Sequence, residues 1–541
     1  ETTWETDDIY ATRTVMYYPF DYDGTNHTSM IVKYYPLSLK EYIVTDTEGN
    51  TTEYYYDDLD RLTKSIKNRL SIYETNINYT YQMEEIEPES GVFVPSMTIK
   101  DEKGNTSKNI YDGLGNIVRQ AKLINDVWTV VFERKYDSFG REYYNDRRDR
   151  LNDIDALVSQ EMAFNDWGMV KSIQYNDGHY EYNDYDPITM KATLWQESAT
   201  ETTSQTVTQY NVNNAVTSKW KINSLGQNIG VKNFHYDGLG QLRSIVDDAG
   251  VFLTYDYDSY GRVIHTTLAD GTKVRKIYAG HTNEKLITHI YADDRLLGEQ
   301  TFDGLGRLKA STVANRTQQF VYELDKPCPY RTLTQDGQVL EYEYITELGN
   351  VVRSVKDKDS LILQEMTYDP VSGDLLTGVN AEGIKFVNTY NNDSTLATET
   401  FTDNGRTVST NYTFSGNGIL LDYVGVDNNN RHSAFNALGQ CLSITEGNIK
   451  LDNEFDTLGR IKKITTTDSQ FSSVSTMEIH YDEFSREWMR SFSCGGQNRS
   501  VEQLYYPDDS LKKRITRKGE TVLLREEYAY PSRNQLYTYS A

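Results

Sequence analysis

The 541-residue sequence has little cysteine and no excess of positive charge. Its three cysteines, Cys328, Cys441 and Cys494, lie far apart without a CxxC spacing, so neither a disulfide framework nor a zinc site is indicated. Acidic residues outnumber basic ones by 80 to 55. This balance argues against nucleic acid as a partner, because phosphates require a basic face, and against attraction to anionic lipid. No run of about eighteen apolar residues occurs, so we expect no membrane-spanning helix.

The common catalytic and cofactor-binding motifs are also missing. There is no HExxH among the eight histidines and no GxSxG nucleophile turn. Gly238 and Gly240 are followed by Arg243 instead of the third glycine of a dinucleotide-binding loop. We therefore predict a non-enzymatic protein with no catalytic residue, no metal ion and no cofactor. The abundant carboxylates leave open one enzymatic alternative, a glycosidase with two facing acids.

Tyrosine is abundant, with 43 Tyr against 17 Phe, and it belongs to a repeated phrase. The phrase is an aromatic residue, Asp or Asn, two residues of which the second is bulky and apolar, and then Gly. We predict a structural role for the aromatic residue, the acid and the glycine of each clear copy. These are Tyr111, Asp112 and Gly115; Tyr136, Asp137 and Gly140; Tyr236, Asp237 and Gly240; Tyr257, Asp258 and Gly261; Phe302, Asp303 and Gly306; Phe435 and Gly439, with Asn436 between them; and Phe455, Asp456 and Gly459.

The spacing of the phrase predicts β-hairpins. Neighbouring clear copies such as Tyr236 and Tyr257 lie 21 residues apart, which suits two strands of five or six residues and two turns. The acid can accept a hydrogen bond from the backbone two residues on, and the glycine supplies the positive φ that ends a type I turn with a bulge. The sequence therefore predicts an all-β fold of repeated antiparallel hairpins.

Three side-chain arrangements follow from this interpretation. The apolar residue inside the turn (Leu114, Leu239, Leu305 and Leu458) is expected to tuck under the neighbouring repeat, since a lone hairpin would leave it in water. The aromatic ring is expected to be buried, with the Tyr hydroxyl on a carbonyl or water. The Arg after the turn glycine, as in Arg141, Arg262, Arg307 and Arg460, is expected to pair with acids of the next repeat.

The phrase resembles the signature of the RHS or YD-repeat family, and most closely the B component of bacterial insecticidal Tc (ABC-type) toxin complexes. The resemblance extends from about residue 46 to residue 533. It implies that the antiparallel hairpins spiral into a curved, hollow RHS/YD-repeat shell over residues 41–541. Residues 1–40 are expected to form a strand-rich segment that leads into the shell, and the chain is expected to be part of a longer one.

The same resemblance implies a function and partners. The function is that of a structural shell segment of a secreted toxin complex, which encloses and protects an unfolded toxic effector polypeptide before delivery. The implied partners are another RHS-shell component, the enclosed effector and a translocation-channel component. An aspartyl self-cleavage core is not expected, because Asp369-Pro370-Val371-Ser372-Gly373 begins like one and then departs from the pattern.

One further alternative comes from the binding class. A YD-repeat protein could act in cell-surface adhesion or glycan binding, with exposed aromatic faces such as Trp167 or Trp195 stacking on sugars.

Overall fold

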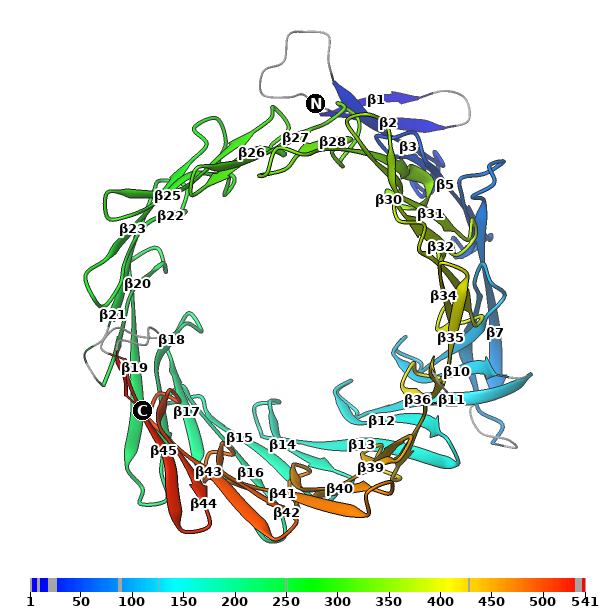
Figure 1. Cartoon of the computed structure of the whole chain (residues 1–541). Coiled ribbons are helices and arrows are strands. Elements are labelled where there is room, and N and C mark those ends of the chain that lie inside the picture. The colour runs from blue at the N-terminus through cyan, green and yellow to red at the C-terminus, as the bar shows by residue number, and fades with distance from the viewer. Residues whose placement is uncertain are drawn as a thin grey trace. The chain divides into compact units, whose positions relative to one another are not determined.

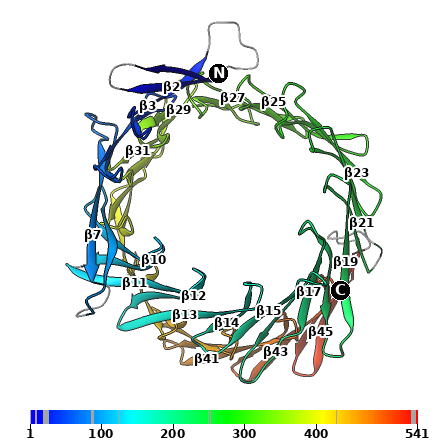
Figure 2. The same cartoon turned by 180° about the vertical axis from the view of Figure 1, so that it is seen from behind.

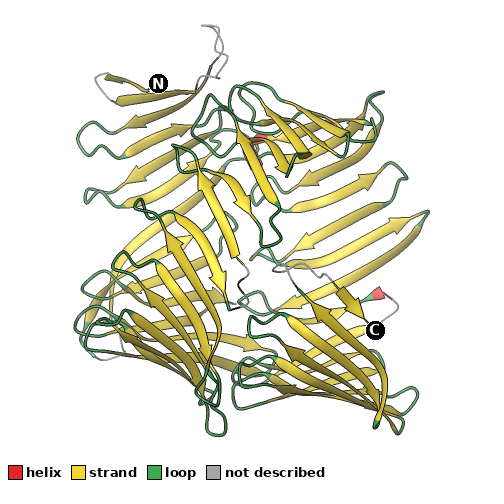
Figure 3. Ribbon diagram, turned by 90° about the vertical axis from the view of Figure 1, so that its left-hand side faces the viewer, coloured by secondary structure: helices red, strands yellow, loops and turns green. Residues whose placement is uncertain are grey.

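The computed structural model describes residues 2–6, 10–17, 27–85, 90–124, 126–248, 250, 252–426, 429–530 and 538–540. Nearly all of these residues lie in strands joined by short turns, as Figure 3 shows. Within this part of the chain, η1 (Thr346–Leu348) is a single 3-10 turn, and Val426 also has 3-10 conformation. The predicted all-β fold of repeated antiparallel hairpins is confirmed.

The chain divides into two compact units. Unit 1 contains residues 1–131, 277–291 and 295–413, and unit 2 contains residues 132–276, 292–294 and 414–541. Each unit holds an early and a late stretch of hairpins, which we name its early strip and its late strip. The predicted separation of residues 1–40 from the repeat region stays a prediction.

In unit 1 the early strip contains β1 (Thr2–Thr6), β2 (Ala11–Tyr17), β3 (Thr28–Tyr34), β4 (Glu41–Thr45), β5 (Thr51–Tyr56), β6 (Leu62–Lys67), β7 (Thr75–Glu85), β8 (Phe93–Lys100), β9 (Thr106–Tyr111) and β10 (Ile117–Ile124). The late strip contains β25 (Arg295–Phe302), β26 (Leu308–Val313), β27 (Arg316–Val321), β28 (Arg331–Leu333), β29 (Val339–Ile345), β30 (Val351–Asp357), β31 (Ile362–Tyr368), β32 (Leu375–Asn380), β33 (Lys385–Tyr390) and β34 (Leu396–Asp403).

In unit 2 the early strip contains β12 (Glu142–Leu151), β13 (Ile154–Phe164), β14 (Val170–Tyr175), β15 (Tyr180–Asp186), β16 (Lys191–Glu197), β17 (Gln205–Tyr210), β18 (Val216–Ile222), β19 (Asn228–Tyr236), β20 (Leu242–Asp247), β21 (Phe252–Tyr257) and β22 (Val263–Thr267). The late strip contains β36 (Leu420–Val424), β37 (Asn430–Phe435), β38 (Cys441–Glu446), β39 (Ile449–Phe455), β40 (Ile461–Asp468), β41 (Ser473–Tyr481), β42 (Glu487–Cys494), β43 (Gln497–Tyr505), β44 (Leu511–Lys518), β45 (Thr521–Ala529) and β46 (Thr538–Ser540). The unit boundaries fall within β11 (Val127–Tyr136), β23 (Lys273–Tyr278), β24 (Ile287–Ala292) and β35 (Arg406–Phe414).

Each strip is a meander in which a strand pairs antiparallel with the strands before and after it in the sequence, as β18, β19 and β20 do. Successive turns of a meander lie at opposite ends of the strands. We call each of the two rows of turns an edge of the strip. The turns that carry the repeated phrase, which we call motif turns, follow odd-numbered strands such as β19 and β39 and share one edge. The turns that follow even-numbered strands, which we call linking turns, lie on the other edge.

The two strips of a unit meet edge to edge. In unit 2, β41 and β43 of the late strip run beside β13–β16 of the early strip in both views (Figure 1, Figure 2). There the linking turns of the early strip contact the motif turns of the late strip, as the backbone N–H of Leu157 does when it donates to the carbonyl of Ala437 at 2.8 Å. In unit 1, Asn105 likewise donates to the carbonyl of Asn392 at 2.7 Å.

The hydrophobic core is small and lies at the junction of strips. Leu151, Ala156 and Leu421 are buried together with Phe435 packed against them. Leu151 and Ala156 come from β12 and β13 of the early strip, and Leu421 and Phe435 come from β36 and β37 of the late strip. Contact between the strips therefore supplies the burial that a single-layered sheet lacks.

Candidate functional site

The motif turn is a three-residue hairpin loop with a bulge. At Asp456 the Oδ1 atom accepts hydrogen bonds from the backbone N–H groups of Leu458 at 3.0 Å and Arg460 at 2.9 Å. Gly459 has a φ of 78° and donates its N–H to the carbonyl of Asp456 at 3.1 Å. The pairing register shifts between Glu454 and Phe455, where the bulge lies. The predicted turn geometry is confirmed at this copy.

The other clear copies repeat this geometry along the chain. Their glycines have φ values between 75° and 86°. The structure places them in the turns β9–β10 (Tyr111, Asp112, Gly115), β11–β12 (Tyr136, Asp137, Gly140), β19–β20 (Tyr236, Asp237, Gly240), β21–β22 (Tyr257, Asp258, Gly261), β25–β26 (Phe302, Asp303, Gly306), β37–β38 (Phe435, Gly439) and β39–β40 (Phe455, Asp456, Gly459). The copies are strung along the sheet edges and do not converge on one site.

The arginine after the turn glycine has a different partner from the predicted one. The Nε atom donates to the acid of its own turn at 2.7 Å in the pairs Arg141–Asp137, Arg262–Asp258, Arg307–Asp303 and Arg460–Asp456. The expected pairing with acids of the next repeat is therefore wrong for this contact. The reason is geometric: the bulge places the first and fifth residues of the turn side by side, so the free carboxylate oxygen faces the guanidinium.

What the arginine contacts in the next repeat is an aromatic ring. The guanidinium of Arg460 lies 4.4 Å from the ring centroid of Tyr481, and that of Arg307 lies 4.5 Å from the ring centroid of Tyr322. Cation–π attraction of this kind is worth about 0.5 to 2 kcal/mol, more when it is shielded from water. The acid, the arginine and the following aromatic residue thus form a three-part lock between consecutive repeats, which we call the repeat lock.

The tyrosine hydroxyls complete the link between repeats. Those of Tyr236, Tyr257 and Tyr481 each donate at 2.8 Å to the carbonyl of the residue that follows the preceding motif turn. These acceptors are Val216, Leu242 and Ile461. Burial raises the pKa of Tyr257 and of Tyr481 above the usual value. The predicted hydroxyl contact with a carbonyl is confirmed at these three copies.

The junction of strips in unit 2 adds contacts that the sequence pattern does not indicate. Arg460 also donates to Glu201 of the early strip at 2.6 Å and to Ser485 at 2.9 Å. Glu483 accepts hydrogen bonds from Ser204 and from the backbone of Ser224. Burial acts to raise the pKa of Glu483, but these hydrogen bonds outweigh it and the pKa lies below its usual value. No local signal marks these pairs, because the partners lie more than 250 residues apart in the sequence.

The apolar residue of the motif turn differs in burial from one strip to another. Leu458 of the late strip is 7% exposed, and Leu305 is half-buried. In contrast, Leu114 and Leu239 of the early strips are 77% and 85% exposed. This residue was expected to tuck under the neighbouring repeat. Leu458 is buried, but its turn contacts the opposite strip, and Leu114 and Leu239 are exposed, contrary to the expectation.

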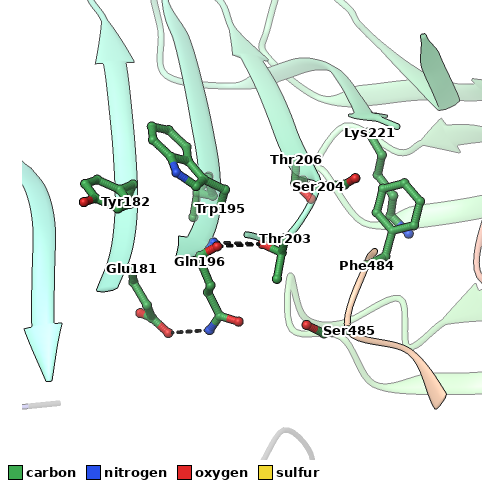
Figure 4. Close-up of a pocket in the computed structure, with 11 residues that line it drawn as sticks. Glu181, Tyr182, Trp195, Gln196, Thr203, Ser204, Thr206, Lys221, Phe484 and Ser485 are labelled. Carbon is green, nitrogen blue, oxygen red and sulfur yellow. Dashed lines mark hydrogen bonds between the residues drawn. The ribbon is translucent and has the colours of Figure 1, made fainter. Parts of the chain in front are cut away.

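A pocket of about 290 Å³ lies at the strip junction of unit 2 (Figure 4). Trp195 stacks on Tyr182 with ring centroids 4.8 Å apart, and both line this pocket. Gln196 donates to Glu181 at 2.9 Å, and Phe484 of the late strip closes the opposite side. The pocket combines aromatic faces with hydrogen-bonding groups. Gln196 pairs with Glu181 and, through its backbone N–H, with Thr203, as the dashed lines in Figure 4 show.

Two kinds of feature are absent from the described residues. They contain no cluster of three or more His, Cys, Asp or Glu side chains arranged to hold a metal ion. Among the same residues, no helix has the length and apolar character required to cross a membrane.

Comparison with known proteins relates the chain to toxin complexes. A family model for the RHS repeat matches residues 236–273, which include the motif turns at Asp237 and Asp258. The fold is similar to the crystal structure of TcdB2-TccC3 without its hypervariable C-terminal region, with a TM-score of 0.73 and 11% identity over 96% of this chain and 35% of that chain. It is also similar to the Photorhabdus luminescens Tc holotoxin pore, with a TM-score of 0.58 and 10% identity over 96% of this chain and 38% of that chain. No curated protein matches the sequence significantly.

The chain spans about a third of the length of the structures that it matches. The matched repeat, the motif turns on either side of it and the shared fold lead to one conclusion. Residues 236–273 match the RHS repeat, and the chain is similar in fold to the solved TcdB2-TccC3 and Tc holotoxin structures.

Proposed function

We propose that the chain is a non-enzymatic wall segment of a secreted toxin complex, which helps to enclose an unfolded effector polypeptide and to protect it before delivery. The observation that carries the proposal is the similarity of nearly the whole chain to the TcdB2-TccC3 structure. Another RHS-shell component, the effector and a translocation-channel component are the partners of this assembly.

The repeat lock supports a structural role. The acids of the motif turns are occupied by backbone N–H groups and arginine side chains, as at Asp137 and Asp456. A carboxylate held in this way stabilises a turn and is not placed to act as an acid or base on a substrate. Where the lock is present, as at Arg307 and Arg460, it links one hairpin to the next, and such continuity is what a wall requires.

A protease-protection experiment tests the proposal. The 541-residue chain is co-expressed with TccC3 whose C-terminal region is replaced by a permanently unfolded, fluorescently labelled polypeptide. If the chain is a wall segment, the polypeptide resists trypsin in the purified complex and becomes sensitive when the complex is unfolded in urea. Digestion at the rate of the free polypeptide would contradict the proposal.

Glycan binding is the second candidate, and the pocket at Trp195 is the observation that favours it. Aromatic faces next to a carboxylate and an amide are a common way to bind a sugar. A glycan array probed with the full chain and with Trp195→Ala tests this alternative. Binding that disappears in the variant would support it, and the absence of binding by the wild-type chain would remove it.

A further inference from the structure

The motif-turn edge of the early strip in unit 2 carries a row of exposed apolar side chains. Six consecutive turns of this edge each present one, with exposed fractions between 66% and 87%. They are Phe139, Trp167, Ile188, Val212, Leu239 and Tyr260. Turns on one edge of a meander repeat every two strands, so neighbours in the row lie about 10 Å apart and the row is on the order of 50 Å long. A regular row of exposed apolar side chains along one edge is a candidate interaction surface.

The late strip of the same unit shows how such an edge is covered. At the motif turn of residues 456–460, Leu458 is buried and the hydroxyl of Thr457 lies 2.8 Å from those of Ser198 and Thr200. At the next motif turn, Glu483 accepts hydrogen bonds from two serines. The groups that make these hydrogen bonds come from linking turns of the early strip.

The covering edge has a recognisable chemistry. Its turns carry hydroxyl groups, as in Ser198 and Ser204, and carboxylates that reach the motif-turn arginine, as Glu201 does with Arg460. One such loop can reach two motif turns, because residues 198–204 contact both the turn of residues 456–460 and the next turn at Glu483. The same motif turn is therefore covered in one strip and bare in the other, and the difference lies in the presence of a matching edge.

We propose that the row of exposed side chains in unit 2 is the docking edge for a further strip of RHS hairpins, supplied by the partner RHS component and applied through its hydroxyl- and carboxylate-bearing linking turns. The proposal deepens the proposed function and rests on it, because it assigns to named residues the surface that receives the partner. We choose this occupant because the motif turns of the late strip in the same unit are already covered by linking turns of another strip of hairpins.

A second copy of the chain is the less suitable occupant. The linking turns of its own late strip include the pairs Gly447–Asn448, Gly495–Gly496 and Gly519–Glu520, each of which joins its two strands directly. In contrast, the covering loop of residues 198–204 is longer and carries several hydroxyl groups and a carboxylate. Short glycine turns offer little to contact an apolar edge.

The test compares two double variants of the full chain. The edge variant is Phe139→Ser with Leu239→Ser, both on the proposed docking edge. The matched control is Phe471→Ser with Leu523→Ser, which removes one exposed Phe and one exposed Leu from the late strip of the same unit. The probe is TccC3 without its hypervariable C-terminal region, and binding is measured by biolayer interferometry. Thermal melting of each variant checks that it is folded.

We expect the edge variant to bind the probe at least tenfold more weakly than the wild-type chain and the control to stay within twofold. Equal affinities of the three proteins, or no binding by the wild-type chain, would overturn the proposal. Sedimentation of the chain alone supplies the other arm: self-association that only the edge variant abolishes would assign the edge to a second copy and overturn the proposed occupant. Protease protection of the cargo, measured with the same variants, tests the proposed function separately from the docking edge. If the edge variant still protects the cargo, the docking proposal fails but the proposed function stands.

Discussion

The guanidinium of Arg460 lies 4.4 Å from the ring centroid of Tyr481, which belongs to the next repeat. It also contacts the acid of its own turn, Asp456, Ser485 of the next motif turn, and Glu201 of the early strip. One side chain thus joins its own turn, the following repeat and the opposite strip. In a repeat protein the stability is approximately a sum of terms within repeats and between neighbours, so this residue contributes to both kinds of term.

Replacing Arg460 by alanine should therefore destabilise the protein by about 2 to 4 kcal/mol, because two largely shielded carboxylates lose their partner. The measurement is the urea midpoint, with hydrogen exchange over residues 456–486 to locate the loss. Arg150→Ala is the control, since Arg150 and its partner Asp155 are both exposed, at 56% and 85%. We expect no measurable change there, and equal losses in the two variants would contradict the role assigned to Arg460.

The hydroxyl of Tyr481 should have a separate and smaller effect. Tyr481→Phe keeps the ring under Arg460 and removes the hydrogen bond to the carbonyl of Ile461. The expected cost is about 1 kcal/mol, the usual net value of such a bond. Tyr260→Phe, at an exposed ring, should leave the urea midpoint unchanged. An unchanged midpoint for Tyr481→Phe would show that water replaces the bond at no cost.

The fold was largely predictable because its determinants are local. The acid and the glycine of each motif turn interact within five residues, so the pattern of Asp456 and Gly459 is enough to indicate a turn with a bulge. The spacing of the copies then fixes the strand lengths and the antiparallel order. Repetition of one supersecondary unit makes the fold class accessible from the sequence.

The side-chain partners were less predictable. Arg460 was expected to reach an acid of the next repeat, but the bulge brings it to Asp456 of its own turn. The burial of Leu458 and the exposure of Leu239 could not be distinguished, because both stand in nearly identical turns. The difference depends on an edge contact between residues more than 250 positions apart, and no local pattern encodes it.

Acid should weaken the motif turns. The hydrogen bond from Arg141 and the backbone donors hold the pKa of Asp137 below its usual value of about 3.9, and Arg61 does the same for Asp57. A lowered pKa in the folded state gives stability that is present above the unfolded pKa and is lost as the pH falls through the folded pKa. The urea midpoint should therefore drop below about pH 4. Asp137→Asn should reduce the loss of urea midpoint below about pH 4. A variant that loses as much as the wild-type protein would contradict the role assigned to Asp137.

Alkaline pH should also destabilise the sheet, through buried tyrosines. Burial raises the pKa of Tyr344 to about 12, and its hydroxyl donates to the carbonyl of Pro329 at 2.9 Å. The folded state favours the neutral form of Tyr344. The stability that this gives is fully present below the usual pKa of about 10 and is lost as the pH rises through about 12. Absorbance at 295 nm should show a late-titrating component that decreases in Tyr344→Phe. Titration of all tyrosines near pH 10 in the folded protein would contradict it.

Leu458 and Leu239 offer the most direct test of the edge contact between strips, because they occupy the same place in the motif turn. Leu458→Ser places a hydroxyl in a covered position and opens a gap, so it should cost about 2 to 3 kcal/mol of unfolding free energy. Leu239→Ser alters a side chain that is 85% exposed and should change the unfolding free energy by less than about 0.5 kcal/mol. Urea unfolding of the two variants, followed by tryptophan fluorescence, measures both values. If the two substitutions were equally costly, burial of the turn leucine would come from within its own hairpin, and the edge-to-edge contact would not be what shields Leu458.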